Sequence, residues 1–197
     1  MRLFACSCCF LALLGAITPA KAGPKVSSRT TSFPISGETG DALLRQLEQK
    51  GPKHGFTSRA IAQTRYTMNS EADWIHADGM CKVTRPQVRL DINYIYPEVK
   101  SEVSGSLRSR WQRFMAGIRK HEEQHGRIAR EMAAEADRTI AGLKVADGKS
   151  CGRLRAEMKR VVAAIVARYE ARQRQFDVVE HSSGGNIEGL VKRLVTK

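Results

Sequence analysis

Beyond its first 22 residues, the sequence lacks any run of apolar residues long enough to cross a bilayer. It also lacks internal repeats and low-complexity segments, and no basic run is interleaved with aromatic residues. These absences argue against a membrane-spanning mature chain, a repeat architecture and a nucleic-acid-binding protein. A length of 197 residues then fits one ordinary domain after processing.

Acidic residues are scarce relative to basic ones. The chain has 33 Lys and Arg residues against 20 Asp and Glu residues, for a net charge of +13. Loss of Arg2 and Lys21 with a cleaved N-terminal segment would lower this charge to +11. Such a charge favours anionic partners, for example an anionic cell-envelope surface. Because the basic residues are scattered over the whole chain, a solvated basic surface is the simpler interpretation.

The N-terminus has the features of a secretory signal peptide. Arg2 supplies a positive end, residues 3–17 are apolar, and Ala20-Lys21-Ala22 forms an A-x-A cleavage signal. We therefore predict a signal peptide over residues 1–22 and a mature chain that starts at Gly23. The protein should be exported to the periplasm or secreted, and N-terminal sequencing of the exported form would check the cleavage site.

Cysteine usage fits this expectation. Cys6, Cys8 and Cys9 leave with the signal peptide, so the mature chain has only Cys81 and Cys151. An even count of two in an exported protein predicts one disulfide between them. That bond would tie the middle of the chain to its last third.

Residues 23–100 have mainly the period-two pattern of β-strands. Strand-like segments end near Pro34, cover residues 60–69, and flank a turn at Asp78-Gly79. The clearest strand runs from Val88 to Tyr96, where apolar and polar residues alternate. One short helix begins after Thr39, a suitable N-cap, and stops at Gly51-Pro52. This half is expected to be a small antiparallel sheet with one short helix.

The periodicity changes to that of helices after Pro97. One apolar stripe follows the spacing of a long helix: Leu107, Trp111, Phe114, Ile118, His121, His125, Ile128 and Met132. A turn is expected at residues 145–152, and a second helix follows with Leu154, Met158, Val161, Ile165 and Tyr169 on one face. The short connection predicts a long antiparallel helical hairpin over about residues 101–197. The fold class is therefore α+β, with a single domain over residues 23–197.

The sequence HEEQH, residues 121–125, lies in the first of these helices. His121 and His125 continue the apolar stripe and lie one turn apart, about 6 Å along the axis, so both imidazoles can reach one metal ion. Glu122 is rotated about 100° from His121, where it can accept a proton from a metal-bound water. The alternative is a metal-free histidine pair satisfied by hydrogen bonds. Unpaired buried polar groups cost about 1–3 kcal/mol each, which favours one Zn²⁺ ion.

A third zinc ligand is expected from the second helix or the residues just after it. If the hairpin turn centres on residues 147–151, the residue opposite Glu123 is near position 175. The donors in that stretch are Glu170, Asp177, Glu180 and His181, and we expect His181, just outside the helix, to be the ligand. Asp177 and Glu170 remain alternatives, and Asp177 could instead accept a hydrogen bond from a ligating imidazole. His54 and His76 are interpreted as structural or exposed.

An ordered set of segments resembles a family of bacterial exported proteins described as predicted secreted zinc-dependent proteases (DUF922). The set comprises FPISGETGDALLRQLEQKGP, AIAQTRYTMN, GMCKVTRPQVRLDINYIYP, WQRFMAGIRKHEEQH and FDVVEH. The resemblance implies a metallopeptidase-like α+β domain with zinc on His121 and His125 and with Glu122 as the base. The chain differs from the family pattern at Tyr66, where relatives often have tryptophan. It also differs at Phe176 and Ser182, which stand for Tyr and Gly.

Two functions follow as expectations. The first is an exported zinc peptidase that hydrolyses peptide bonds in a peptide or protein substrate, with a strand such as Val88–Tyr96 pairing with the extended substrate. The alternative is a non-catalytic zinc-containing module that binds anionic cell-envelope material. Glu122 beside the ligands favours the enzyme. Closure of the fourth zinc position, by Asp177 as well as His181, would favour the module.

Overall fold

A computed structural model describes residues 23–54 and 58–196, so the predicted signal peptide lies outside the described residues. In chain order the elements are β1 (Lys25–Ile35), α1 (Gly40–Lys50), β2 (Lys53–His54), β3 (Ser58–Arg59), β4 (Gln63–Ala77), β5 (Met80–Val99), α2 (Gly105–Ala141), β6 (Lys144–Ala146), α3 (Gly152–His181) and α4 (Asn186–Val195).

The strands β4 and β5 form one long hairpin. Their antiparallel pairing runs from Gln63↔Ile95 to Ala77↔Met80. The turn between them is Asp78-Gly79, as the sequence predicts, with φ values of 51° and 70°. Positive φ at both central residues is the geometry whose twist matches that of the flanking strands, and Asp-Gly is a preferred pair for it.

The other neighbours of β5 make the sheet mixed. β1 pairs parallel to β5 over the register Lys25↔Arg89 to Ile35↔Val99, and β6 pairs with the first residues of β5. The expectation of a wholly antiparallel sheet is therefore wrong for β1. Parallel neighbours need a long crossover connection, and the segment between β1 and β5, which contains α1, supplies it. The expectation that Val88–Tyr96 offers an edge to a peptide is also wrong, since this strand is paired on both sides.

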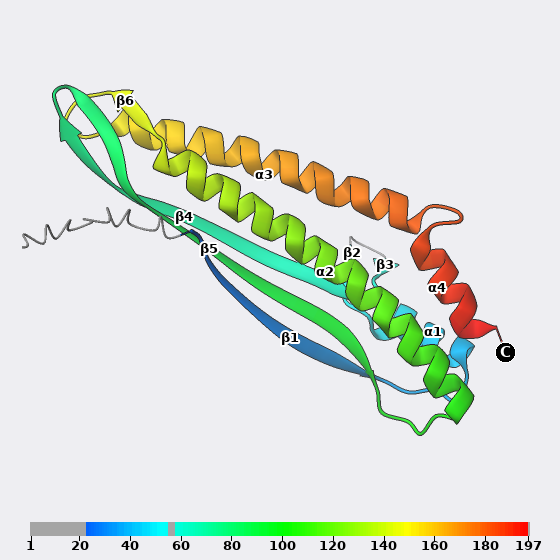
Figure 1. Cartoon of the computed structure of the whole chain (residues 1–197). Helices are drawn as coiled ribbons and strands as arrows, with labels where there is room; N and C mark the ends of the chain where they lie inside the picture. The colour runs from blue at the N-terminus through cyan, green and yellow to red at the C-terminus, as the bar shows by residue number, and fades with distance from the viewer. Residues whose placement is uncertain (1–22, 55–57, 197) are drawn as a thin grey trace, which may run out of the picture.

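The helices α2 and α3 form the predicted antiparallel hairpin and lie along one side of the sheet (Figure 1). The 37 residues of α2 span about 55 Å, which matches the long strands beneath it. The core contains the inward face of β5 (Val88, Leu90, Ile92) and the apolar stripe of α2 (Phe114, Ile118, Met132). The α+β class is confirmed, with a mixed sheet in place of an antiparallel one.

The two ends of the helical hairpin are built differently. Cys81 in β5 and Cys151 before α3 form the predicted disulfide at one end, with a Cα–Cα distance of 5.6 Å and both side chains buried. At the other end, α1 and α4 pack together and α4 also contacts α2 and α3. The cap on α1 is the predicted one, since the Thr39 hydroxyl accepts from Ala42 N at 3.1 Å.

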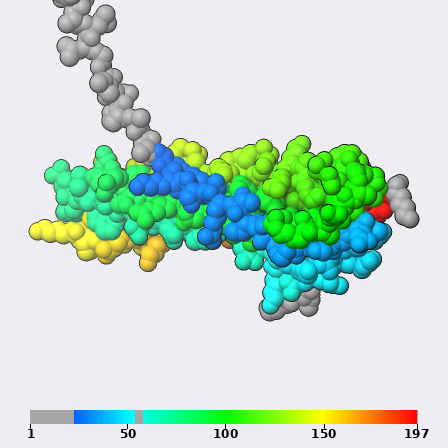
Figure 2. All heavy atoms as spheres, turned by 90° about the horizontal axis from the view of Figure 1, so that it is seen from below, coloured from blue at the N-terminus to red at the C-terminus, as the bar shows by residue number. Residues whose placement is uncertain are grey.

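The helix α4 is not among the elements that the sequence pattern predicts. Its apolar residues Ile187, Leu190 and Leu194 are buried. The resulting body is elongated, and β1 is the edge strand of the sheet on the side of β5 opposite β4 (Figure 1 and Figure 2). None of the helices in the described ranges is long and apolar enough to cross a membrane.

Candidate metal centre

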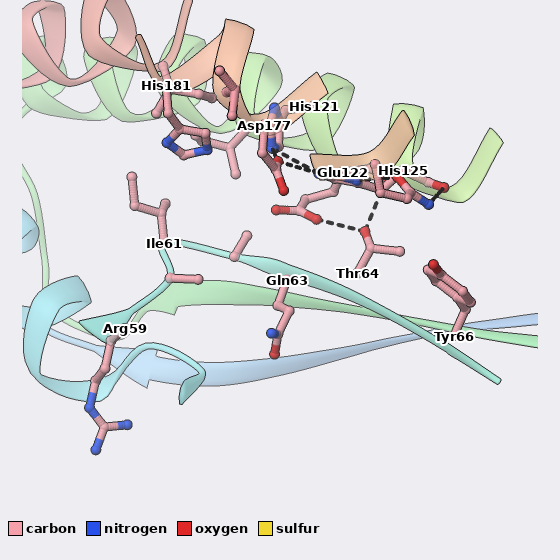
Figure 3. Close-up of a pocket in the computed structure, with 16 residues that line it drawn as sticks. Arg59, Ile61, Gln63, Thr64, Tyr66, His121, Glu122, His125, Asp177 and His181 are labelled. Carbon is pink, nitrogen blue, oxygen red and sulfur yellow. Dashed lines mark hydrogen bonds and ion pairs between the residues drawn. The ribbon is translucent and has the colours of Figure 1, made fainter. Parts of the chain in front are cut away.

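His121, Glu122 and His125 of HEEQH lie in the middle of α2, on the side that faces α3 and the sheet (Figure 3). His121 and Glu122 are each 6% exposed, and the His125 side chain is 13% exposed. The helical i, i+4 spacing brings the two imidazoles together, so that His121 Nε2 and His125 Nε2 lie 3.2 Å apart. The sequence expectation that both rings converge on one point is therefore met in geometry.

The helix α3 adds a carboxylate to this pair. Asp177 Oδ1 lies 2.9 Å from His125 Nε2 and 3.4 Å from His121 Nε2. One turn before Asp177, Gln173 contacts His125. The residue numbers of the pairs His121/Asp177 and His125/Gln173 both average 149, a position inside the predicted turn. The residues that face each other across the hairpin are therefore those that the sequence predicts.

The three atoms have the spacing of metal ligands. Zinc binds His nitrogen and carboxylate oxygen at about 2.0–2.2 Å, so neighbouring ligand atoms around a tetrahedral ion are about 3.4 Å apart. The three distances here, 3.2, 2.9 and 3.4 Å, come close to that value. A two-nitrogen, one-oxygen set is also chemically suited to zinc.

Gln173 fixes the direction of the His125 lone pair. Its Nε2 donates to the His125 backbone oxygen at 3.1 Å, so its Oε1 is the atom that faces His125 Nδ1, at 2.6 Å. Because an amide oxygen only accepts, Nδ1 carries a proton, and Nε2 is the nitrogen that can bind a metal or share a proton with Asp177. Gln173 is 8% exposed and holds this tautomer in a buried position.

The second imidazole has no comparable partner. His121 Nδ1 is buried and makes no hydrogen bond within the described ranges, and Glu180 Oε2 lies 3.5 Å away, beyond good hydrogen-bond length. The Glu180 carboxylate also accepts from Asn186 Nδ2 at 3.0 Å. With Nδ1 turned toward a carboxylate, His121 Nε2 also faces His125 Nε2 and Asp177 Oδ1. Three electron-pair donors crowded together in this way need a cation or shared protons between them, so the residues present fit a metal ion.

His181 lies close to this group but less tightly. It is the last residue of α3, so the expectation that it stands outside the helix is wrong; the helix continues through Phe176 and Asp177 to its end. Its ring centroid is 5.3 Å from that of His121, and ligand atoms of His121, Asp177 and His181 all lie within 4.8 Å of one another. Glu170, the third alternative, is not part of this group and instead influences Tyr66 electrostatically.

Glu122 is held beside the imidazoles by the sheet. The Thr64 hydroxyl of β4 donates to Glu122 Oε2 at 2.7 Å and also lies 3.0 Å from the Glu122 backbone oxygen. Burial raises the pKa of Glu122, and the bond from Thr64 offsets part of that increase. The carboxylate is therefore positioned beside the His121–His125–Asp177 group and is tuned toward accepting and returning a proton.

The electrostatics of the group favour a charged Asp177. Burial alone would raise the pKa of Asp177, but hydrogen bonds from His121 and His125 outweigh it and hold that pKa well below its ordinary value. Burial disfavours a proton on His125, yet its bonds to Asp177 and Gln173 raise its pKa. Burial and the nearby His121 lower the pKa of His181, which keeps that ring neutral and able to bind a metal.

A cavity of about 640 Å³ opens onto these groups. One part of its wall is apolar and comes from four different segments, with Ile61 before β4, Ile118 on α2, Val178 on α3 and Ile187 on α4. Ile61 points into the space below His181, whereas Arg59 points away from it (Figure 3). A ligand of some size can therefore reach the imidazoles.

Sequence reasoning missed Thr64 and Gln173. Both could have been found from patterns already in use, since Thr64 shares the inward face of its strand with Ala62 and Tyr66, and Gln173 lies opposite His125 in the hairpin register. Of the other histidines, His76 Nε2 lies 3.1 Å from Asp147 O beside the disulfide end, in agreement with a structural role. The structure describes no side chain for His54.

The fold and this site together define an α+β protein with an HExxH motif on a helix that covers a sheet. The chain matches the family described as "Bacterial protein of unknown function (DUF922)" over residues 30–185, and it belongs to that family. Comparison with curated proteins and with solved structures gives no match. The matched residues include most of the sheet and the helical hairpin. The description of the family gives no activity.

Proposed function

We propose that the protein is an exported zinc-dependent peptidase that cleaves peptide bonds by general-base attack of water. The observation that carries this proposal is the convergence of His121 Nε2, His125 Nε2 and Asp177 Oδ1 within 3.4 Å of one another, with the Glu122 carboxylate beside them. A purely structural metal site has no need of that carboxylate. His121, His125 and Asp177 would hold the ion, with His181 at its border.

When bound, zinc would act as a Lewis acid that polarises the scissile carbonyl and makes a water molecule more acidic. Glu122 accepts the proton of the attacking water and delivers it to the leaving amine nitrogen. Thr64 keeps the Glu122 carboxylate in one orientation through its 2.7 Å hydrogen bond. Gln173 orients the His125 imidazole from behind.

The substitution Glu122→Gln tests this proposal. It keeps the shape of the side chain but removes the ability to accept a proton. We expect the variant to fold, to keep its zinc and to keep its unfolding free energy within about 1 kcal/mol. Its hydrolysis of a peptide library should fall by at least about 10²-fold relative to the parent. Equal activity in the two proteins would exclude Glu122 as the base, and an inactive zinc-loaded parent would exclude the peptidase.

One observation favours the alternative of a non-catalytic zinc module that binds anionic envelope material. His181 lies within 4.8 Å of the donor atoms of His121 and Asp177, so it is close enough to become a fourth protein ligand after a small shift. Four protein ligands would close the position that water needs. The electronic spectrum of the cobalt-substituted protein separates the two, because an added small anion changes the spectrum of an open site and leaves a closed one unaltered.

A further inference from the structure

The strand β4 has one unpaired edge. It pairs with β5 on one side, and in the described ranges no strand pairs with its other side. Its register with β5 is regular from Gln63 to Asp73, where a shift occurs before Trp74. Every second residue of such a strand directs its N–H and C=O groups away from its neighbour. About five residues therefore present free backbone donors and acceptors over a length of about 35 Å.

The regular part of this edge, Gln63 to Asp73, has charged side chains only on its solvent face (Arg65, Glu71 and Asp73) and lacks two other features that discourage pairing. Natural exposed edges usually contain Lys or Pro residues that discourage another strand from joining. The segment Gln63–Ala77 contains neither. The opposite edge of the sheet, β1, has Lys25 near its start and Pro34 near its end. The difference between the two edges points to β4 as the one that receives another strand.

The inward side chains of β4 are incompletely covered. On β5, Val88, Leu90 and Ile92 are at most 2% exposed. On β4 the residues of the same face, among them Tyr66, Met68, Ala72 and Trp74, are only partly buried against the core. A further strand beside β4 would cover the rest of this face with alternate side chains of its own.

The β4 edge begins at the metal centre and extends away from it in one direction only. Thr64, near the beginning of β4, binds Glu122, and the cavity is lined by residues 59–64 together with Tyr66. All of the regular edge beyond Tyr66 therefore extends away from the site in one direction. In the other direction the cavity ends against Ile61 and Ile187, where α4 packs.

We propose that the substrate is an extended polypeptide that binds along β4 as an additional strand, so that recognition is one-sided. Several residues on one side of the cleaved bond pair with the edge from Arg65 to Asp73. On the other side a short segment places an apolar side chain against Ile61, Ile118 and Ile187. This inference rests on the proposed peptidase function and narrows its substrates to unfolded or extended segments with alternating apolar residues.

Binding of synthetic peptides to the zinc-loaded Glu122→Gln protein tests the inference without any need for cleavage. The probes are fluorescent peptides of about six and about fourteen residues with alternating Val and Ser, and a set in which each backbone nitrogen in turn is methylated. We expect the longer peptide to bind at least tenfold more tightly. Methylation should weaken binding at every second position and not at the positions between, because only alternate N–H groups face the edge.

A pair of neighbouring substitutions supplies the control on the protein. Ser70 is on the inward face of β4 and Asn69 is on the solvent face. Ser70→Lys places a charge on the half-covered inward face, which an added strand would bury, and should remove the advantage of the longer peptide. Asn69→Lys adds the same charge on the other face and should change binding by less than about twofold.

The outcomes separate this inference from the peptidase proposal. If methylation at alternate peptide positions weakens binding to Glu122→Gln but the parent cleaves no peptide, the inference stands and the peptidase proposal is refuted. Cleavage by the parent without length dependence or without the period-two pattern would refute the inference and keep the peptidase. Equal effects of Ser70→Lys and Asn69→Lys on folded protein, or no binding of either peptide, would also overturn the inference.

Discussion

At the scale of single residues, the central feature is a set of three potential ligand atoms, two imidazole nitrogens and one carboxylate oxygen, that lie within 3.4 Å of one another. Gln173 assigns the proton of His125 to Nδ1, and His121 Nδ1 lies near Glu180, so both Nε2 atoms face the Asp177 carboxylate. Such an arrangement is costly unless a cation or shared protons lie between the three atoms. The side chains behind the imidazoles thus argue for a metal as strongly as the histidines themselves.

Asp177 is the first residue to test. Its Oδ1 lies 2.9 and 3.4 Å from the two Nε2 atoms, whereas the donor atom of His181 belongs to a looser group that spans up to 4.8 Å. We therefore expect Asp177→Ala to lower zinc affinity at least about 100-fold and His181→Ala to lower it less. Competition with a chelator of known affinity measures both. A larger loss in His181→Ala would reassign the third ligand to His181.

Gln173 provides a second test of the same centre. Gln173→Leu keeps much of the volume but removes the acceptor for His125 Nδ1–H and the donor to the His125 backbone oxygen. Loss of such an orienting partner typically costs 10–100-fold in metal affinity. A matched control is Gln175→Leu, at an exposed position two residues along α3, which should leave zinc affinity unchanged. Equal affinities for parent and Gln173→Leu would show that this amide does not orient the ligand.

At the scale of elements, the glycine that follows HEEQH sets how closely α2 approaches the sheet. A Cβ at Gly126 would lie 2.0 Å from Tyr94 Oη and 2.9 Å from Tyr94 Cζ. The Tyr94 side chain of β5 therefore occupies the space that a side chain at position 126 would need. The same Tyr94 hydroxyl accepts from Arg130 at 3.2 Å. The motif is thus held against β5 by a contact that only glycine allows.

We expect Gly126→Ala to destabilise the protein by about 1–3 kcal/mol despite the higher helix propensity of alanine. Tyr94→Phe in the same chain should recover part of that loss, because it removes the closest atom. Gly105→Ala is the control, since nothing lies within 4 Å of a Cβ there. Urea unfolding of the four proteins measures the effects. A Gly126→Ala protein as stable as the Gly105→Ala protein would contradict the packing described here.

The elements also show what the sequence could predict. The Asp78-Gly79 turn, the Thr39 cap and the apolar stripe of α2 are local signals, and each element they predict is present. The parallel pairing of β1 and the docking of α4 depend on contacts between segments far apart in the chain, which periodicity does not report. The same limit applies to the site, since the convergence of His121 and His125 follows from spacing, whereas the choice between Asp177 and His181 depends on how α3 ends.

At the scale of the whole molecule, the disulfide and the metal centre lie at opposite ends of α3. Cys151 precedes the helix and Asp177 is near its end, so about 40 Å of helix separates them. The bond closes the end at which β4, β5 and β6 meet the hairpin. It is therefore expected to act on global stability and not on the metal centre directly.

We expect the double variant Cys81→Ser/Cys151→Ser to lose about 2–4 kcal/mol of unfolding free energy. Its folded fraction should still bind zinc as tightly as the parent, since the bond lies far from the ligands. Urea unfolding and chelator competition on the same sample give the two values. A folded double variant with weakened zinc binding would show that the bond holds the register of the helical hairpin.

The metal content of the purified protein, residues 23–197, tests the assignment of the metal centre most directly. We predict one zinc ion per chain, retained in Glu122→Gln and lost in His125→Ala, with all three proteins folded by circular dichroism. The two substitutions lie three residues apart on α2, so they separate a ligand from a base on the same helix. A folded parent that binds no zinc at micromolar concentrations, or a His125→Ala variant that keeps the full amount, would contradict the assignment of HEEQH as a metal centre.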